Sequence, residues 1–370
     1  MIRILVAAFL MDMALYLTMT GAPYRALQLG AGTLVLGLLA SARAIPYSLL
    51  TIWAGSQSTP EHRTRLTRIV LPFGAIGVLL LAFVSHVAMI FVLLAVLGVA
   101  LAFFWPALMA SVADRVPPKA MARAVGWFNL AWSSGKGVGF LCGGILLERA
   151  GFFTVFLVAA ALMMVAATLV GSSGKHEAVA PEEDAYEPKH LHTYRWVCWV
   201  GTAFTMGMVA VMNHHLPEWL EARGWSESVF GGFLGATFLT QTVAFVFLGR
   251  TGSWNYRPWP LILSTLVLSG VMLAVPFLQK PVWFFVLAPF MGVSMGLLFS
   301  SSLIYSLAGR EKRGRNAGIN EAFVGLGTVL FPVLGGLAGS LTQNLDAPYL
   351  FSAASGVGLI LLQINRLSGK

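Results

Sequence analysis

Four ionisable side chains lie inside otherwise apolar stretches of the 370-residue chain: Asp12, Arg43, Lys136 and Glu321. A charged side chain near the middle of a bilayer costs about 2.5 to 3.5 kcal/mol on the insertion scale, so we expect each to face a cavity or another charge. Asp12 can bind and release a proton, and the two cations can hold it or bind an anionic or polar group. Such charges indicate ion pairing, solute binding or proton transfer within a membrane.

Asp12, Arg43 and Lys136 all fall near the middle of their apolar stretches. At 1.5 Å per helical residue, Asp12 lies about 15 Å from the start of its stretch and Lys136 about 21 Å from the start of its own. Two interpretations remain open. Either Asp12 is permanently paired with a cation and holds the helices together, or the three line a cavity in which Asp12 exchanges partners or protons and the surplus positive charge binds part of a solute.

Glu321 differs because it lies near the start of its stretch, close to Arg313 and Arg315. It can form an ion pair at the membrane surface or complement the start of its helix. Alternatively, it is a protonatable group that couples or gates transport.

The elements that must position these groups follow from the composition, which is 57% hydrophobic and only 11% charged. Soluble domains carry roughly 25% charged residues. Twelve apolar stretches are long enough to cross about 30 Å of hydrocarbon as helices. They cover residues 2–20, 32–54, 69–85, 88–112, 122–147, 152–170, 196–213, 228–248, 259–278, 282–307, 317–341 and 347–364. The sequence therefore predicts an all-α integral membrane protein with twelve transmembrane helices.

One long polar stretch, residues 171–195, divides the chain and is rich in Gly, Ser, Pro and acidic residues. We expect an N-terminal six-helix bundle (1–170), a cytoplasmic linker (171–195) and a C-terminal six-helix bundle (196–370). The loops are too short to assemble an enzyme active site. The two cysteines, Cys142 and Cys198, lie in apolar runs, so we expect no catalytic residues, no metal and no cofactor.

The basic residues are distributed unequally between the two sides of the predicted membrane. With the N-terminus inside, eighteen of the 24 Lys and Arg residues fall on one side, which the positive-inside rule identifies as cytoplasmic. Both termini are therefore expected in the cytoplasm, in an inner or plasma membrane. This orientation accounts for the net charge of +9 without a nucleic-acid partner.

The two halves repeat each other, the mark of an internally duplicated fold. At an offset of 192, an arginine and four glycines recur; at an offset of 194, a proline, three glycines and another arginine recur. The first set is Arg123, Gly126, Gly135, Gly143 and Gly144 on Arg315, Gly318, Gly327, Gly335 and Gly336; the second is Pro23, Gly30, Gly37, Gly55 and Arg63 on Pro217, Gly224, Gly231, Gly249 and Arg257. The halves are thus expected to be pseudo-symmetric.

These glycines resemble the major facilitator superfamily, and the resemblance covers essentially the whole chain. The fifth span matches the glycine motif of its antiporter-type and multidrug-efflux members, with Phe140 where that motif has proline. Small residues at this spacing let helices pack closely in lipid, where burial alone gives no drive. The predicted packing glycines are Gly126, Gly135, Gly139, Gly143, Gly144, Gly318, Gly327, Gly335 and Gly336.

Two other motifs of the superfamily are degenerate. Thr59 stands where the loop between the second and third spans has an aspartate, and Arg63, Arg65 and Arg68 keep only its basic part. Leu94 holds the place of the arginine found in drug and proton antiporters. These departures separate the chain from the drug-antiporter pattern and leave the fold prediction unchanged.

The resemblance implies a secondary transporter that moves a small organic solute by alternating access, with proton coupling as the leading hypothesis. An uncoupled uniporter and a non-transporting sensor or assembly partner are the alternatives. The superfamily's architecture lines the path with the first, fourth, seventh and tenth spans, which adds Tyr16, Trp105, Asn213, Ser301 and Tyr305 to the mid-membrane charges. Together with Asp12, Arg43 and Lys136, these are the candidate solute or coupling residues. Asp12 and Glu321 are the candidates for protonation or gating. The expected partners are the solute, protons and the lipid bilayer, and we expect a monomer.

Overall fold

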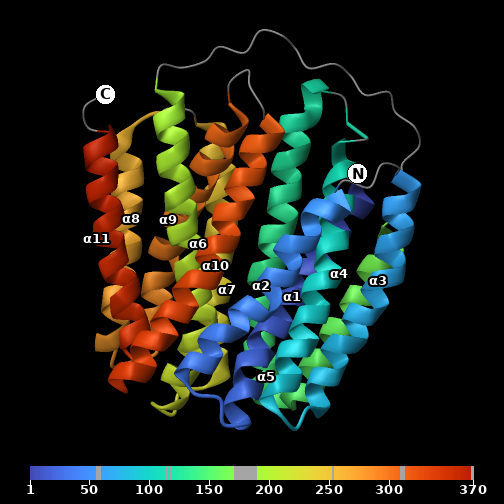
Figure 1. Ribbon diagram of the computed structural model, residues 1–370, viewed down its shortest axis with the longest axis vertical. Helices are drawn as coiled ribbons and strands as arrows, with labels where there is room; N and C mark the ends of the chain where they lie inside the picture. Colours follow the sequence, from blue (N-terminus) through green and yellow to red (C-terminus); the bar gives the residue numbers. More distant parts are fainter. Residues whose placement is uncertain are drawn as a thin grey trace. The chain divides into compact units, whose positions relative to one another are not determined.

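The computed structural model describes residues 1–55, 60–113, 115–116, 118–170, 190–251, 254–308 and 313–367. Within these ranges the chain is helical and contains no strand. The helices are α1 (Ile2–Gln28), α2 (Thr33–Gly55), α3 (Pro60–Leu80), η1 (Leu81–Phe83), α4 (Val87–Ala113), α5 (Pro118–Leu169), α6 (Leu191–Glu221), α7 (Glu227–Arg250), α8 (Pro258–Ala274), η2 (Val275–Phe277), α9 (Val282–Leu307), α10 (Arg313–Thr342) and α11 (Ala347–Leu367) (Figure 1). Thr59 and most of the predicted linker lie outside the described residues.

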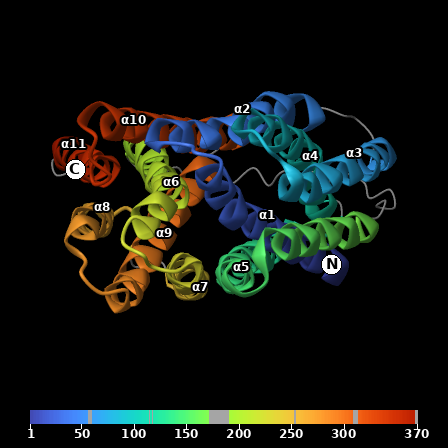
Figure 2. The same cartoon turned by 90° about the horizontal axis from the view of Figure 1, so that it is seen from below.

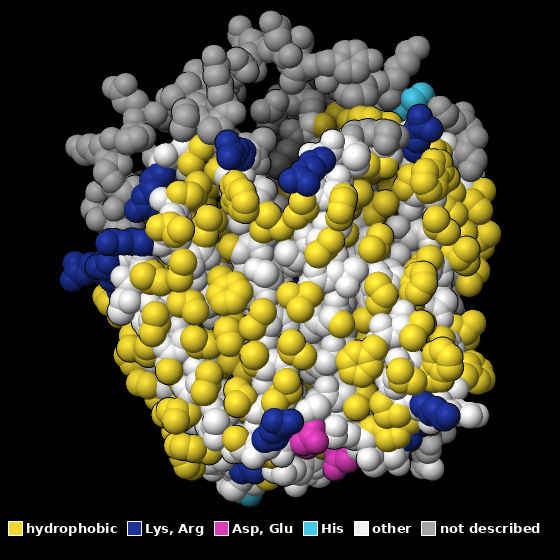
Figure 3. Space-filling view, turned by 180° about the vertical axis from the view of Figure 1, so that it is seen from behind, with side chains coloured by type: hydrophobic (Ala, Val, Ile, Leu, Met, Phe, Trp, Pro, Cys, Tyr) yellow, Lys and Arg dark blue, Asp and Glu magenta, His cyan; other side chains and the backbone are white. Residues whose placement is uncertain are grey.

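Eleven helices in the described ranges are long and apolar enough to cross a membrane. On the face seen in Figure 3, hydrophobic side chains cover the middle of the helices, and charged side chains lie toward the helix ends. This pattern is what a hydrocarbon surrounding requires, because unpaired charges are costly there.

Helix α5 contains two of the predicted spans. Its 52 residues would extend about 78 Å as one helix, more than twice the hydrocarbon thickness. The break occurs at Gly151, whose φ of 74° and ψ of 179° are accessible chiefly to glycine. Gly151 separates the predicted stretches 122–147 and 152–170. Each of the twelve predicted stretches therefore falls on a helix.

Some helices extend beyond their predicted ends. Helix α1 continues through Pro23 to Gln28, and α6 continues through Pro217 to Glu221. A proline removes one backbone hydrogen bond and kinks a helix without having to end it. Helix α3 begins at Pro60, where a first-turn proline loses no helical bond. The first turns of α3 are polar. The predicted stretch began only at residue 69, where the apolar residues begin.

The internal repeat recurs in the backbone. Gly30 after α1 and Gly224 after α6 both have positive φ, 82° and 67°. The 3-10 turn η1 after α3 also has its counterpart in η2 after α8, at the same offset of 194 in sequence. Positions that are paired by the sequence repeat thus also share their backbone conformation.

The chain forms two compact units. Unit 1 comprises Met1–Gly32, Ser41–Val179 and Leu220–Leu239, and unit 2 comprises Thr33–Ala40, Ala180–Trp219 and Thr240–Lys370. In unit 1, α1 packs on α5 and α4, and α3 packs on α4 and α5. In unit 2, α8 packs on α9 and α11, and α10 packs on the same two helices (Figure 2). Each unit thus includes a short segment from the opposite half of the sequence.

Most of the predicted packing glycines lie where helices touch. Gly135 of α5 faces Phe9 of α1, and a Cβ there would overlap the carbonyl oxygen of Phe9. Gly327 of α10 makes the equivalent contact with Ala203 of α6. A tight surrounding is also found at Gly139, Gly143, Gly144, Gly335 and Gly336. Close packing of neighbouring helices therefore explains why these seven positions hold glycine.

The packing prediction does not extend to Gly126 and Gly318. A Cβ on either glycine would meet no atom within 4 Å. Both residues are exposed and lie toward the first turns of α5 and α10. The repeat correctly paired these two positions, but close packing does not require glycine at them.

A pair of alanine substitutions in α5 tests this close packing. We expect Gly135→Ala to destabilise the protein by about 1 to 3 kcal/mol, because the backbone of Phe9 must move to admit the methyl group. Gly126→Ala is the matched control in the same helix, where alanine should be neutral or better by up to about 1 kcal/mol. Thermal unfolding of the purified protein in detergent measures both. Equal stability of the two variants would contradict the observed contact between α1 and α5.

Candidate functional site

Asp12 lies on α1 in unit 1 and is buried, with 4% of its surface exposed. Lys136 of α5 and Arg43 of α2 act on it electrostatically, Lys136 more strongly than Arg43. Both cations are half-buried. The structure therefore brings the three predicted mid-membrane charges into one electrostatic cluster, from three helices of the same unit.

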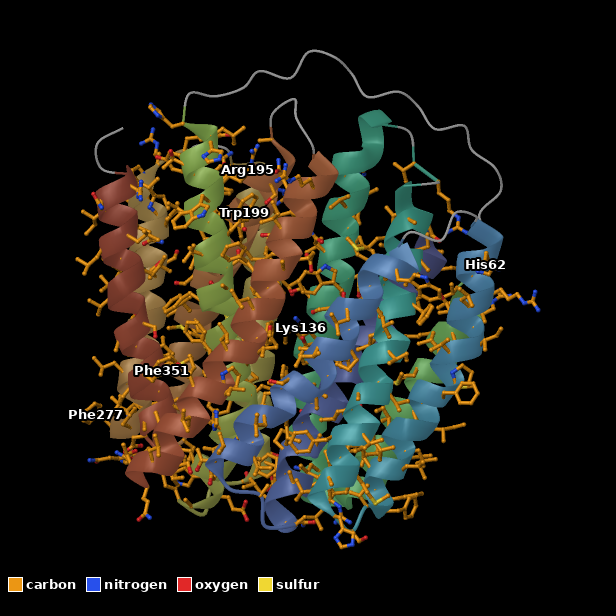
Figure 4. The ribbon with its side chains drawn as sticks, viewed as in Figure 1. His62, Lys136, Arg195, Trp199, Phe277 and Phe351 are labelled. Atoms are coloured by element: carbon orange, nitrogen blue, oxygen red, sulfur yellow. The ribbon has the colours of Figure 1, made fainter. Side chains whose placement is uncertain are left out.

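Aromatic rings surround the ammonium group of Lys136. Its Nζ lies 4.6 Å from the ring centroid of Tyr16, 4.9 Å from that of Trp132 and 4.8 Å from that of Phe238. A cation is attracted to the face of an aromatic ring within about 6 Å of its centroid. We call Tyr16, Trp132 and Phe238 the aromatic cage. Figure 4 shows Lys136 about midway along the part of α5 that precedes Gly151.

Phe140 packs against two rings of the aromatic cage. It is fully buried, its ring stacks on Phe238 at a centroid distance of 5.6 Å, and it contacts the ring of Tyr16 at 4.8 Å. Phe140 occupies the place where the glycine motif of the superfamily has proline. The departure from the motif thus supplies a ring that fixes two members of the cage.

Helical spacing and glycines position these groups. Asp12 and Tyr16 are four residues apart on α1, and Lys136 is four residues from both Trp132 and Phe140 on α5, so each set shares a helix face. A Cβ on Gly139 would lie 3.1 Å from the Cβ of Tyr16. The absent side chain of Gly139 therefore lets α1 approach α5 closely enough for Tyr16 to reach Lys136.

The sequence predicted four further solute residues, one in unit 1 and three in unit 2. Trp105 of α4, in unit 1, packs edge-on against Phe104 and Phe128 at centroid distances of 5.2 and 6.1 Å. Ser301 of α9, in unit 2, is buried and donates a hydrogen bond of 2.8 Å to the carbonyl oxygen of Leu297. Their part in solute binding stays a prediction.

Tyr305 and Asn213 have different surroundings in unit 2. The hydroxyl of Tyr305 accepts a 2.8 Å hydrogen bond from the backbone N–H of Tyr256. Asn213 of α6 is buried, and its amide nitrogen lies 3.5 Å from Nε2 of His214. Its Oδ1 has no hydrogen-bond partner within the described structure. Asn213 therefore retains an unpartnered acceptor that a solute could use.

Glu321 of α10 is exposed, and so is Arg315 in the same helix. The side chain of Arg313 lies outside the described residues. The structure therefore leaves both interpretations of Glu321 open, as a surface ion pair or as a gating acid.

Sequence reasoning missed two of the three residues of the aromatic cage. Trp132 could have been found, because it precedes Lys136 by one helical turn and so shares its face. Phe238 could not, since α7 lies a hundred residues further along the chain and nothing in the sequence predicts which of its rings meets α5.

His215 was not predicted as a packing residue either. It is 1% exposed in unit 2, and its Nε2 lies 2.9 Å from the carbonyl oxygen of Pro332 in α10. A carbonyl oxygen only accepts, so Nε2 carries the hydrogen. Gly37 of α2 lies against the same carbonyl group. His215 therefore lies in the packing between α2, α6 and α10.

The described helices and the buried charge cluster define a polytopic α-helical membrane protein of the transporter class. The family model of the Major Facilitator Superfamily matches residues 4–307, and the chain belongs to this superfamily. It is therefore a multi-pass transmembrane transporter and not an enzyme, and the predicted all-α fold is confirmed.

Curated relatives and solved structures agree with this assignment. The chain is 24% identical over 345 residues to the multidrug resistance protein MdtG of Escherichia fergusonii, covering 89% of this chain and 82% of that protein. It is 26% identical over 339 residues to MdtG of Citrobacter koseri, covering 87% and 80%.

Two solved transporters share the fold at low sequence identity. A bacterial homolog of the human lysosomal transporter Spinster, in an inward-facing and occupied conformation, aligns over 99% of this chain and 94% of its own, with a TM-score of 0.70 and 12% identity. A point mutant of the nucleoside transporter NupG aligns over 99% of both chains, with a TM-score of 0.70 and 14% identity.

Proposed function

We propose that the protein is a proton-coupled secondary transporter of a small organic solute, with Asp12 as the group that binds the proton. The observation that carries this proposal is the buried carboxyl group of Asp12 beside Lys136 and Arg43 in the middle of apolar helices. A membrane-embedded acid with cationic neighbours is suited to exchange a proton for an ion pair during a transport cycle.

The solute is proposed to contact the same cluster. Tyr16, Arg43 and Lys136 offer a ring and two cations beside Asp12, while Trp105, Asn213, Ser301 and Tyr305 remain proposals for the rest of the path. The MdtG relatives are named multidrug resistance proteins, which supports an organic solute with apolar surface. The cluster's aromatic rings support the same class of solute.

Alternating access is proposed to proceed by breaking two equivalent glycine contacts. In unit 1, Gly144 of α5 lies against Gly231 of α7; in unit 2, Gly336 of α10 lies against Thr33 of α2. In each case a helix of residues 1–170 touches a helix of residues 196–370. These two halves, joined by the linker 171–195, are the proposed moving bundles, and small side chains let their helices separate and close again without obstruction.

The orientation and state of assembly are proposed as well. In unit 1, basic residues lie at the start of α1, in the first turns of α3 and in the α4–α5 connection, which supports a cytoplasmic location for that end. By the same reasoning, we propose that both termini lie in the cytoplasm and that the protein lies in the inner membrane. Glu321 is proposed as a second protonatable group, and the working unit as a monomer.

Reconstitution into proteoliposomes tests the proposed function. We expect an imposed pH gradient to drive accumulation of a solute found by screening organic compounds, with a proton flux that requires the solute. Solute movement that ignores the pH gradient would identify a uniporter. Absence of movement for every compound that binds the protein would identify a sensor or assembly partner and overturn the proposal.

A further inference from the structure

We propose that the solute is an organic monoanion with an apolar body, and that it binds together with the proton on Asp12, so that both move in the same direction. This inference rests on the proposed function of the Asp12 site. It adds the charge of the solute and the direction in which the solute moves relative to the proton.

The first step is the charge of the site. Arg43 and Lys136 contribute two positive charges, and Asp12 contributes one negative charge when ionised. The other elements packed nearby do not cancel the surplus: α4 contains no charged residue among Val87–Ala113. The α7 segment in unit 1 carries only Glu227, which lies by Gly144, two helical turns beyond Lys136. The site is therefore positive in both states of Asp12.

The second step is that the aromatic cage holds the ammonium group of Lys136. Three ring faces within 5 Å of its Nζ stabilise the ammonium form without needing a carboxylate. Arginine stays protonated in proteins. Asp12 is then the group of the cluster that titrates, and its protonation raises the charge of the site from +1 to +2.

The third step is linkage between the two ligands. An anion binds more tightly to the site of charge +2 than to the site of charge +1, so protonation of Asp12 favours its binding. Because coupling between two sites is reciprocal, the bound anion also favours protonation of Asp12. Proton and anion therefore bind cooperatively, which is the requirement for carrying them in one direction.

The aromatic cage also argues against a cationic solute. A cage of three rings is the arrangement that recognises organic ammonium ions. Here Lys136 already occupies it, and Arg43 adds like charge. An anion is instead attracted by both cations, and the half-buried rings of Tyr16 and Trp132 add apolar surface beside them.

Three probes of one shape and different charge test the inference. They are 4-phenylbutyrate, the neutral 4-phenylbutanamide and the cationic 4-phenylbutylamine, titrated calorimetrically into the purified full-length protein between pH 5.5 and 8.5. We expect 4-phenylbutyrate, which is ionised throughout, to bind at least tenfold more tightly than the other two. Its affinity should rise toward low pH, by up to about tenfold per pH unit where Asp12 titrates.

Two variants separate this result from a general effect of pH. In Asp12→Asn, which mimics the protonated acid, 4-phenylbutyrate should still bind and its affinity should no longer change with pH. Glu221→Gln, at an exposed position at the end of α6, should behave as wild type. Tighter binding of the amine, a pH-independent affinity in wild type, or no binding of any probe would overturn the inference.

The binding assay and the transport assay fail independently. Binding of 4-phenylbutyrate without any solute transport would overturn the proposed function and leave the anion site intact. Transport of an organic cation in exchange for protons would support the proposed function and overturn the anion inference.

Discussion

Replacing Asp12 with Asn is expected to abolish accumulation driven by a pH gradient. In wild-type proteoliposomes, one proton carried per solute molecule supports at most about tenfold accumulation for a gradient of one pH unit, since each factor of ten corresponds to about 1.4 kcal/mol. In Asp12→Asn the accumulation ratio should fall to one, because the side chain at the centre of the charge cluster can no longer release a proton.

The same variant should retain solute exchange. Asparagine keeps the size and polarity of a protonated aspartate, so the loaded transporter should still cross between its two states. Exchange of labelled for unlabelled solute, without a gradient, measures this step. Glu221→Gln is the control and should accumulate solute normally. Normal accumulation in Asp12→Asn would show that Asp12 is a fixed partner of Lys136 and Arg43 that does not titrate.

The sequence predicted the helices and the repeat well for identifiable physical reasons. Spans follow from apolar length, and even the turn at Gly151 falls between two stretches that hydropathy separates. The repeat at offsets of 192 and 194 correctly paired Gly135 with Gly327, which make the same backbone contact in units 1 and 2. Such local and repeated features can be recognised in a single sequence.

The site was only partly predictable because contacts between distant helices leave no trace in a single sequence. The cost of charge in lipid singled out Asp12, Arg43 and Lys136, and the structure brings all three together. The aromatic cage depends on which ring of α7 meets α5, and that is decided by the glycines that let the helices touch.

The same limit applies to compensating changes between the halves. The position equivalent to Gly139 in the repeat is Phe331. In unit 2 the ring of Phe331 packs against Gly207, the counterpart of Met13, which Gly139 faces in unit 1. The glycine of this contact is on α5 in unit 1 and on α6 in unit 2, so the glycine and its larger partner have exchanged helices.

Enlarging Gly144 is expected to stop transport while leaving the protein folded. A Cβ at this position would lie 2.5 Å from the carbonyl oxygen of Glu227 and 2.9 Å from Cα of Gly231, so leucine cannot fit while α5 and α7 touch. Gly144→Leu should hold the helices apart and reduce transport by about 100-fold, because a state that cannot form interrupts the cycle. Gly126→Leu, at an open position of the same helix, should transport normally.

Labelling from outside distinguishes separated helices from an unfolded protein. Tyr24 of α1 is buried, and its ring contacts that of Phe230 in α7 edge-on at 5.8 Å. A cysteine at position 24 should react with a membrane-impermeant maleimide several-fold faster in Gly144→Leu than in the parent, while the melting temperature shows that the fold persists. Gly144→Ala provides a milder step and should fall between the two. Unchanged labelling and transport in Gly144→Leu would show that the α5–α7 contact is not part of the transport cycle, since the backbones would then accept a large side chain without consequence.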